Sequence, residues 1–382
     1  MGKKYIIPEG TRDLILEDCS SKKKLQRDLE DIFNKWGYEE IITPTIEFYQ
    51  TFSSGFQNLK EEDVYKFFDT KGRILVLKPD MTIPIARVVA TKLKDANVPI
   101  RCRYCSDVFR VHESLGGKKN EYTDCGIELI GLDSDKADLE ILVTSLDALS
   151  VLGDREVKLE LGDINFFNSA VKNLNLDEDE KETLANLIDR KSLKELEDYL
   201  NKFDINSSYK DFLKELPWLF GGPEVLEKAK CFAINSELRD SIEYLEQLFS
   251  KLKELGYEDK ISFDLGMVPR LDYYSGIIFK GYVDGAGATV LSGGRYDSLM
   301  SNFGKDMPAI GFSVNLDTMM SVINRSNLDE IEKFKVYYSK KDEIMVLKKA
   351  MVLRSEGKIV ELCPNEDIET IEVEKEVKKQ WL

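Results

Sequence analysis

Strand-like segments lie on both sides of a long helical stretch, and this arrangement limits the folds that the chain can adopt. From about residue 166 to residue 258, Lys, Glu, Leu and Asp dominate, and helical periods recur with interruptions near Pro217 and at Gly221-Gly222-Pro223. We predict a helical insertion here that takes no part in the sheet. Strands are predicted in the flanks at 38–47 (broken at Pro44), 73–77, 101–110, 122–132, 157–165, 261–265, 277–283, 286–291 and 308–314.

Helices are predicted between these strands. In the first of them, within residues 10–36, Leu25, Leu29 and Phe33 recur at four-residue spacing, so one helix face is apolar. The glycine-rich loop at 116–120 favours an antiparallel hairpin between the strands on either side of it. Further helices are predicted at 83–94, 135–152 and 316–323. The pattern indicates an α+β fold with a largely antiparallel sheet and segregated helices.

The last 54 residues have a different texture, with a short strand, a helix and a second strand at 335–338, 343–356 and 358–362. We therefore expect a core domain at 1–328, which contains the helical insertion at about 166–258. A small α/β C-terminal domain is expected at 329–382.

Composition narrows the classes of function. No run approaches the roughly 18 apolar residues of a membrane span, and the N-terminus has no apolar stretch long enough for a signal peptide. The six cysteines are therefore expected to be reduced thiols of a cytoplasmic protein. With 70 acidic and 54 basic residues, the net charge of −16 opposes a polyanionic partner such as tRNA.

A single histidine, His112, leaves little material for a catalytic triad, and it is expected to be an ordinary loop residue. Cys102 and Cys105 have the spacing of a zinc-binding pair, and Cys125 follows them, but no second pair completes a site. We therefore predict no metal, no cofactor and no catalytic residue.

A series of short motifs runs in order through residues 5–320: Pro8 to Asp13, Gly37-Tyr38, Thr43 to Glu47, Phe109-Arg110, Tyr122 to Gly131, Leu271 to Tyr274, Gly293 to Asp297, and Pro308 to Phe312. Each is weak alone. Together they resemble the opening segment, motifs 1 to 3 and the histidine-specific signatures of class II aminoacyl-tRNA synthetases of the histidyl type. The resemblance implies a synthetase-like antiparallel sheet with flanking helices, and a dimer interface at motif 1.

The resemblance also implies a histidine-binding site. Asp80 and Thr82 stand in the amino-acid loop and would meet the ammonium of the ligand, and Arg110 would meet its carboxylate. The imidazole end would be bounded by Glu128, Tyr273 and Tyr274.

Asp124 also belongs to the implied site, at a position where the synthetases carry glutamine, so the ammonium could be held differently. These residues have plainer interpretations too. Tyr273 and Tyr274 could pack within a strand, Arg110 and Glu128 could form a surface ion pair, and Gly311-Phe312 could be core.

The cations that the synthetases use on ATP are missing from their expected positions. Thr318 stands where motif 3 has an arginine, and Pro269 stands where an arginine precedes the Leu-Asp-Tyr-Tyr motif. Arg270 is one place too late, and a shift by one residue in a strand turns the side chain to the other face. Adenylate formation depends on cations held in place around the phosphates, so little of that activity is expected.

A kept pocket without these arginines resembles the family of ATP phosphoribosyltransferase regulatory subunits. That resemblance implies a non-catalytic subunit, required for the activity of a short-form catalytic subunit and for histidine feedback in histidine biosynthesis. It implies a homodimer within a hetero-octamer, histidine as the allosteric effector, and neither tRNA nor membrane as partner. Two alternatives stay open, which are a divergent histidyl-tRNA synthetase and a stand-alone histidine-binding module.

Overall fold

In the computed structural model, the structure describes residues 6–55, 61–111, 119–172, 174–268, 274–323, 329–339, 341 and 343–380. The chain divides into two compact units. The core unit comprises Met1–Arg12 and Gln26–Val322, and the C-terminal unit comprises Asp13–Leu25 and Ile323–Leu382. Helix α1 (Glu17–Lys35) runs through the division. A turn at Trp36-Gly37 follows the helix, and the positive φ of 81° at Gly37 suits a residue without a Cβ.

A single sheet, with nine strands among the described residues, forms the centre of the core unit. Neighbouring strands are antiparallel except for the parallel pairs β1–β5 and β7–β9, which confirms the predicted α+β class. In spatial order the strands are β1 (Glu39–Glu40), β5 (Ile100–Phe109), β6 (Glu121–Ile130), β12 (Ala309–Asn315), β11 (Leu291–Arg295), β10 (Ile277–Val283), β7 (Val157–Asp163), β9 (Ile261–Asp264) and β8 (Phe220–Gly221).

Further helices and a second, smaller sheet complete the core unit. The small sheet is antiparallel in the order β2 (Ile46–Phe48), β4 (Ile74–Leu77), β3 (Lys66–Phe68). The helices outside the insertion are α2 (Tyr49–Gly55), α3 (Thr82–Thr91), α4 (Asp135–Ser150), α11 (Asp297–Ser301) and α12 (Leu316–Met319). Helix α4 packs on β7, β10 and β12. Single 3₁₀ turns occur at Glu61–Asp63, Leu216–Trp218, Glu258–Lys260 and Met320–Val322.

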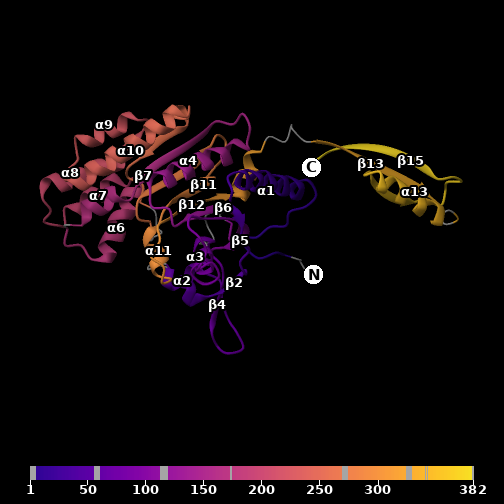
Figure 1. Cartoon of the computed structure of the whole chain (residues 1–382), viewed down its shortest axis with the longest axis horizontal. Coiled ribbons are helices and arrows are strands. Elements are labelled where there is room, and N and C mark those ends of the chain that lie inside the picture. Colours follow the sequence, from indigo (N-terminus) through magenta and orange to yellow (C-terminus); the bar gives the residue numbers. More distant parts are fainter. Residues whose placement is uncertain are drawn as a thin grey trace. The chain divides into compact units, whose positions relative to one another are not determined.

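The predicted insertion folds into a group of helices that Figure 1 shows together at one end of the core unit. They are α5 (Asn165–Val171), α6 (Glu178–Asp189), α7 (Leu193–Leu200), α8 (Ser207–Glu215), α9 (Glu224–Lys230) and α10 (Ser236–Glu254). Local signals fix their ends, because Asp177 and Glu180 form a reciprocal capping box at α6 and Asn235 caps α10. Helix α10 buries a stripe at helical spacing against α4, α5 and α9.

Two predictions about the core sheet were wrong. The insertion does contribute to the sheet, since Phe220–Gly221 forms the edge strand β8 against β9, where Gly221 adopts a φ of 140°. The strand predicted at 286–291 instead spans Leu291–Arg295. Ser292, Gly293 and Gly294 have little intrinsic strand preference, but β10 and β12 bond to this backbone from both sides and define the strand.

The C-terminal unit contains a three-stranded sheet in the order β14 (Ile359–Pro364), β13 (Asp329–Tyr338), β15 (Glu372–Gln380). Helix α13 (Glu343–Ser355) connects the parallel strands β13 and β14, and β15 pairs antiparallel with β13. The predicted tail lacked β15. Its sequence is dominated by Glu and Lys, and it becomes a strand because β13 offers a complete ladder of backbone partners.

Candidate functional site

Six of the seven predicted binding residues converge on one cavity of about 80 Å³ at the middle of the core sheet. They are Asp80, Thr82, Arg110, Asp124, Glu128 and Tyr274. Tyr273 lies outside the described residues. The remaining lining comes from Met81, Tyr104, Ser292, Gly293, Gly294, Tyr296, Gly311, Phe312 and Ser313. The cavity is therefore built by the start of α3 and by β5, β6, β11 and β12.

Asp80 presents a buried carboxylate oxygen to this cavity. Its Oδ1 accepts a hydrogen bond from the backbone N–H of Ile83 at 3.1 Å, in the first turn of α3. Its Oδ2 has no hydrogen-bond partner among the described residues. Burial raises the pKa of Asp80 to about 6, although the nearby Arg110 favours the charged form. A buried carboxylate oxygen without a donor is costly, and a ligand ammonium would satisfy it.

Glu128 lies on β6 and is almost fully buried, which excludes the surface ion pair as an interpretation. Burial raises the pKa of Glu128 to about 8, and hydrogen bonds oppose the shift. Thr82 Oγ1 donates to Oε1 at 2.9 Å, and Tyr296 Oη donates to Oε2. Gly311 faces this carboxylate so closely that an added Cβ would collide with Oε2. Gly311 therefore makes room for Glu128 in the cavity.

Asp124 and Arg110 supply opposite charges to the same cavity. Burial raises the pKa of Asp124 to about 7, and the repulsion of Asp80 adds to the shift while Arg110 opposes it. Arg110 Nε donates to the backbone oxygen of Pro79 at 2.8 Å, and the guanidinium lies 5.9 Å from the ring centroid of Tyr122. Three carboxyl groups thus share the cavity with one arginine, which favours a ligand that carries a positive charge.

Tyr274 borders the cavity beside the glycine-rich strand β11. A Cβ at Gly294 would collide with the Tyr274 ring and with the backbone oxygen of Ile277. The glycines therefore allow an aromatic side chain to pack directly on the sheet backbone. This geometry accounts for the Gly-Gly pair and the tyrosine appearing together among the sequence motifs.

The region expected to hold ATP in a synthetase carries an additional carboxylate. Asp317 accepts from Arg12 Nη2 at 2.5 Å, from Lys119 Nζ at 3.2 Å and from the backbone N–H of Thr123 at 3.0 Å. The backbone N–H of Thr318 donates to Asn315 Oδ1 at 2.8 Å, in a helix cap. Asp317 therefore engages two cations beside the missing motif 3 arginine. Pro269 and Arg270 lie outside the described residues.

Sequence reasoning missed Tyr296, Tyr104 and Asp317. Tyr296 stands inside the Gly-Gly-Arg-Tyr-Asp motif and could have been proposed from it, whereas Tyr104 alternates within an ordinary strand pattern. Tyr104 and Tyr296 both hydrogen-bond Glu128. Asp317 is joined to Arg12 across 305 residues, and no local signal predicts such a contact.

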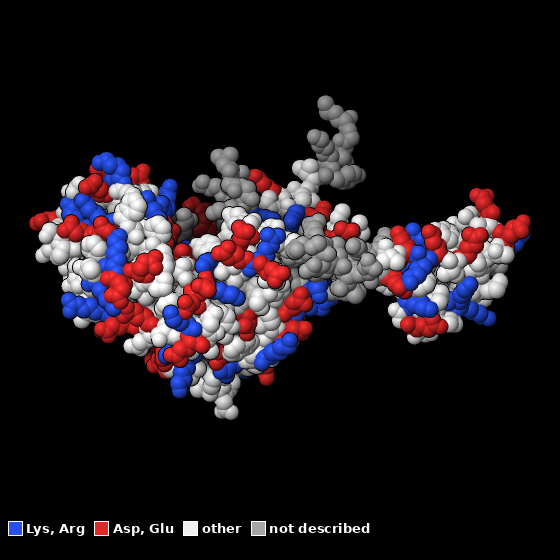
Figure 2. Space-filling view, turned by 90° about the horizontal axis from the view of Figure 1, so that it is seen from above, with Lys and Arg blue, Asp and Glu red and all other residues white. Residues whose placement is uncertain are grey.

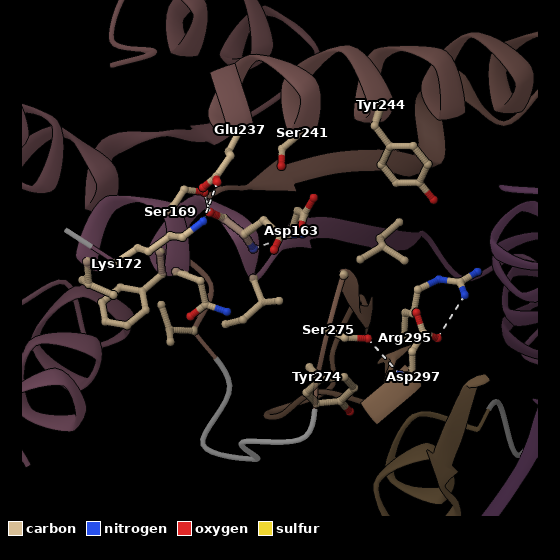
Figure 3. Close-up of a pocket in the computed structure, with 18 of the residues that line it drawn as sticks. Asp163, Ser169, Lys172, Glu237, Ser241, Tyr244, Tyr274, Ser275, Arg295 and Asp297 are labelled. Carbon is tan, nitrogen blue, oxygen red and sulfur yellow. Dashed lines mark hydrogen bonds and ion pairs between the residues drawn. The ribbon is translucent and has the colours of Figure 1, made fainter. Parts of the chain in front are cut away.

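A second cavity of about 1050 Å³ lies between the sheet and helices α5, α6 and α10 of the insertion. Figure 3 shows Lys172 and Glu237 on one side and Arg295 on another. The basic side chains here are paired, and acids such as Glu182 and Asp240 line the cavity as well. Arg295 Nη2 contacts Asp138 Oδ1 at 2.6 Å and Nη1 contacts Asp297 at 3.1 Å, while Lys172 contacts Glu237 at 2.7 Å. Tyr274 lines this cavity as well as the small one.

The expectation that all cysteines are reduced thiols is wrong for one pair. Cys105 on β5 and Cys125 on β6 form a disulfide. They stand directly opposite each other in the antiparallel register, which brings their Cα atoms to 4.1 Å. Cys102 stays a buried free thiol. In the described part of the chain, no cluster of His, Cys, Asp or Glu is arranged to hold a metal ion, and no helix is long and apolar enough to cross a membrane.

Comparisons with known proteins agree with this geometry. Residues 10–319 match the family model described as histidyl-tRNA synthetase. The ATP phosphoribosyltransferase regulatory subunit of Clostridium botulinum strain Langeland is 41% identical over 340 residues, which cover 88% of this chain and 80% of that protein. The chain belongs to the family of ATP phosphoribosyltransferase regulatory subunits. The Clostridium kluyveri member is 40% identical over 366 residues, covering 94% of this chain and 93% of the relative.

Solved structures of this family and of the synthetases share the fold. A protein of Bacillus halodurans C, described as an ATP phosphoribosyltransferase regulatory subunit/histidyl-tRNA synthetase, superposes with a TM-score of 0.84 at 29% identity and covers 97% of this chain and 95% of that one. The histidyl-tRNA synthetase of Nostoc sp. PCC 7120 gives a TM-score of 0.76 at 20% identity, covering 97% of this chain and 88% of that one. The second likeness concerns the fold alone.

Proposed function

We propose that this chain is the non-catalytic regulatory subunit of ATP phosphoribosyltransferase, which a short-form catalytic subunit requires for activity and for feedback inhibition by histidine. One combination carries the proposal. A carboxylate-lined cavity persists at the amino-acid position, while beside it Thr318 replaces a motif 3 arginine and Asp317 engages Arg12 and Lys119. Such a site can hold a zwitterion, whereas Arg12 and Lys119, which could meet the phosphates of ATP, are engaged by Asp317 among the described residues.

The ligand proposed for the cavity is histidine. Its ammonium would meet Asp80 Oδ2 and Asp124, its carboxylate would meet Arg110, and its imidazole would lie between Glu128 and Tyr274, with Tyr273 also proposed at that end. Thr82 already donates to Glu128, so its proposed role is to orient that carboxylate as well as to border the ammonium.

The size of the cavity supports a coupling between binding and conformation. Ligand pockets typically measure about 300–1,000 Å³, whereas this cavity measures about 80 Å³. Histidine would therefore bind an enlarged form better than the form described above. A ligand shifts an equilibrium by its differential affinity for the two forms, and this difference would carry the inhibitory signal.

We propose a homodimer within a hetero-octamer, located in the cytoplasm, without tRNA as partner. Ile42 and Phe48 flank the motif 1 segment, and Phe68 lies in the small sheet that contains β2; all three are exposed on the single chain and would be covered in a dimer. Figure 2 shows Lys and Arg interspersed with Asp and Glu over the visible face. Together with the net charge of −16, this distribution supports a protein partner over a polyanion.

Reconstitution tests the proposal directly. Adding the purified chain to a short-form catalytic subunit should restore phosphoribosyl transfer, and histidine should inhibit the complex. The Asp80→Asn variant should still activate transfer but lose sensitivity to histidine. Failure of the wild-type chain to activate would overturn the proposal. Histidine-dependent exchange of pyrophosphate into ATP by the chain alone would instead identify a working synthetase.

A further inference from the structure

The sheet of the C-terminal unit has one face that its single helix covers only in part. A helix is about 10 Å wide and strands lie about 4.8 Å apart, so one helix covers about two strands. Helix α13 packs on β13 and β14, with Val346 and Ala350 buried against Val336 and Val360. Figure 1 shows this one helix against the three-stranded sheet. The third strand, β15, therefore lacks a helical cover among the described residues.

The strand register identifies the uncovered side chains. Val373 of β15 stands opposite Val336, and Lys375 stands opposite Phe334. Directly opposed residues point to the same face of a sheet, so Val373, Lys375 and Val377 share the face that carries α13. Val373 is 40% exposed and Val377 is 52% exposed. These values are high for valines on the inner face of a two-layer unit.

The flank of α13 toward β15 is also apolar and exposed. Arg354 donates to the backbone oxygen of Val360, on β14, at 3.0 Å. The side of α13 that carries Arg354 therefore faces β14. At about 3.6 residues per turn, Met345, Lys349 and Val352 lie on the opposite flank. Met345 is 58% exposed and Val352 is 57% exposed. We name the surface formed by Met345, Lys349, Val352, Val373 and Val377 the α13–β15 groove.

The opposite face of the same sheet carries more paired charge than the face with α13, on which Lys375 pairs with Glu332. Its side chains form ladders of paired charges, with Lys333 bonded to Glu361, Lys335 to Glu376 at 3.1 Å, and Tyr337 to Glu374 at 2.8 Å. Charges paired in this way suit a face that stays in water. Within residues 329–380, exposed apolar side chains lie mostly on α13 and on the half-covered face, and Ile359 is an exception on the charged face.

Charge indicates the kind of occupant. Lys348 and Lys349 lie on the exposed side of α13, and neither forms an ion pair with a described residue. Residues 329–382 contain 13 acidic and 11 basic residues, so the segment as a whole does not attract a polyanion. An apolar groove bordered by these lysines fits a helix that has an apolar stripe with carboxylates beside it.

A second copy of this chain fits the groove less well. Contact between two α13 helices about a twofold axis would place Lys348 and Lys349 near their own counterparts, and like charges at a contact repel. Insertion of an acidic helix of another copy would be a head-to-tail contact, which generates open chains of molecules unless the rotation closes. The groove therefore favours a different protein.

We infer that the α13–β15 groove docks an acidic amphipathic helix of the catalytic subunit, an inference that rests on the proposed function for the identity of the partner. The helix would complete the second layer of the sheet over β15. It would bury Val352, Val373 and Val377 against its apolar stripe and set its carboxylates beside Lys348 and Lys349.

The test measures binding of the short-form catalytic subunit to the full-length chain by calorimetry. The first groove variant is Val352→Glu, and the second combines Lys349→Glu with Val377→Ser. Each variant should raise the Kd for the catalytic subunit at least tenfold. The matched control Ile359→Ser removes an equally exposed apolar side chain (48%) from the opposite sheet face and should leave the Kd within twofold. Thermal melting should show all variants folded, because every substituted side chain is largely exposed.

Three outcomes would overturn the inference, and they are distinguishable. If the wild type binds and activates the catalytic subunit and the groove variants do so equally well, the groove is not the docking site while the proposed function stands. If light scattering shows that the groove variants lose self-association and keep the same Kd, a second copy occupies the groove. If the wild type does not bind at all, the proposed function fails and the inference fails with it.

Discussion

Two cavities of the core unit differ in volume by more than tenfold, at about 1050 and about 80 Å³, and histidine is proposed to bind in the smaller one. In the large cavity Arg295 pairs with Asp138 and Lys172 pairs with Glu237, so the chain itself supplies partners for the cations there. In the small cavity Asp80 keeps a buried oxygen without a donor.

On the proposed assignment, volume is a poor guide to function in this protein. A buried charge that the fold does not compensate is costly, and such charges cluster where a ligand completes them. Paired charges in a roomy cavity instead hold two structural elements together. The comparison predicts that substitutions in the large cavity change stability, whereas those in the small one change ligand binding.

The largest effect is expected from Arg295→Met in the large cavity. The substitution leaves Asp138 buried without its cation, and breaking a buried pair in this way costs about 3–5 kcal/mol. Urea unfolding would measure the loss, and the further substitution Asp138→Leu should recover a large part of it. A loss below about 1 kcal/mol would contradict the assignment of this cavity to stability.

Asp80→Asn, in the small cavity, should weaken histidine binding without lowering stability. Hydrogen bonds to charged groups contribute about 1.5–3 kcal/mol, which corresponds to a rise in the Kd for histidine of roughly tenfold to a hundredfold. The free protein should be equally stable or more stable, because a buried charge without a partner has been removed. Calorimetry and thermal melting check the two parts separately, and a variant that loses stability together with binding would erase the distinction between the cavities.

Stability should fall as pH rises through the range in which the small cavity titrates. The pKa values of Asp80, Asp124 and Glu128 are raised to about 6, 7 and 8, whereas unfolded acids titrate near 4. Between these values the native chain binds more protons than the unfolded chain, so the unfolding free energy decreases with rising pH.

The difference between wild type and Asp80→Asn isolates the contribution of one group to this pH dependence. Urea unfolding at pH 5.5, 7 and 8 should show a weaker decrease in the variant. Hydrogen bonds lower the pKa values of Asp69 and Glu197. These two groups change the unfolding free energy only at more acidic pH, so they do not affect the comparison at pH 5.5 to 8. Equal slopes in the two proteins would mean that Asp80 does not titrate in this range.

The smallest effect is expected from Glu182→Gln, an exposed acid in the large cavity. The change in stability should stay within about 0.5 kcal/mol, and the Kd for histidine should not change. A clear loss of histidine binding in this variant would mean that the large cavity takes part in recognition.

Much of the fold was predictable because alternating apolar residues mark the buried strands. The glycine-rich loop at 116–120 predicted the hairpin of β5 and β6, and the helices predicted at 83–94 and 135–152 correspond to α3 and α4. The strand β11 could not be placed this way, since Ser292, Gly293 and Gly294 become a strand only through neighbours on both sides. Tertiary pairing also decided β8 and β15.

The candidate site, like the fold, was predictable from the sequence only in part. Asp80, Arg110 and Glu128 lie in three separate segments of the sequence. They could be proposed as site residues because the ordered series of motifs resembles a family in which these segments form one site. The contact of Asp317 with Arg12 joins the two ends of the core unit, and the bond between Cys105 and Cys125 depends on strand register. Neither has a local signature, so only the assembled fold reveals them.

The position of Tyr274 gives the large cavity a use that requires no ligand of its own. Tyr274 lines both cavities. A movement of its ring into the large cavity, beside the insertion, would therefore enlarge the small cavity, which is too small for an amino acid as it stands. The large cavity beneath α5, α6 and α10 would then act as an expansion space. It would allow the small cavity to enlarge without separating the strands that line it.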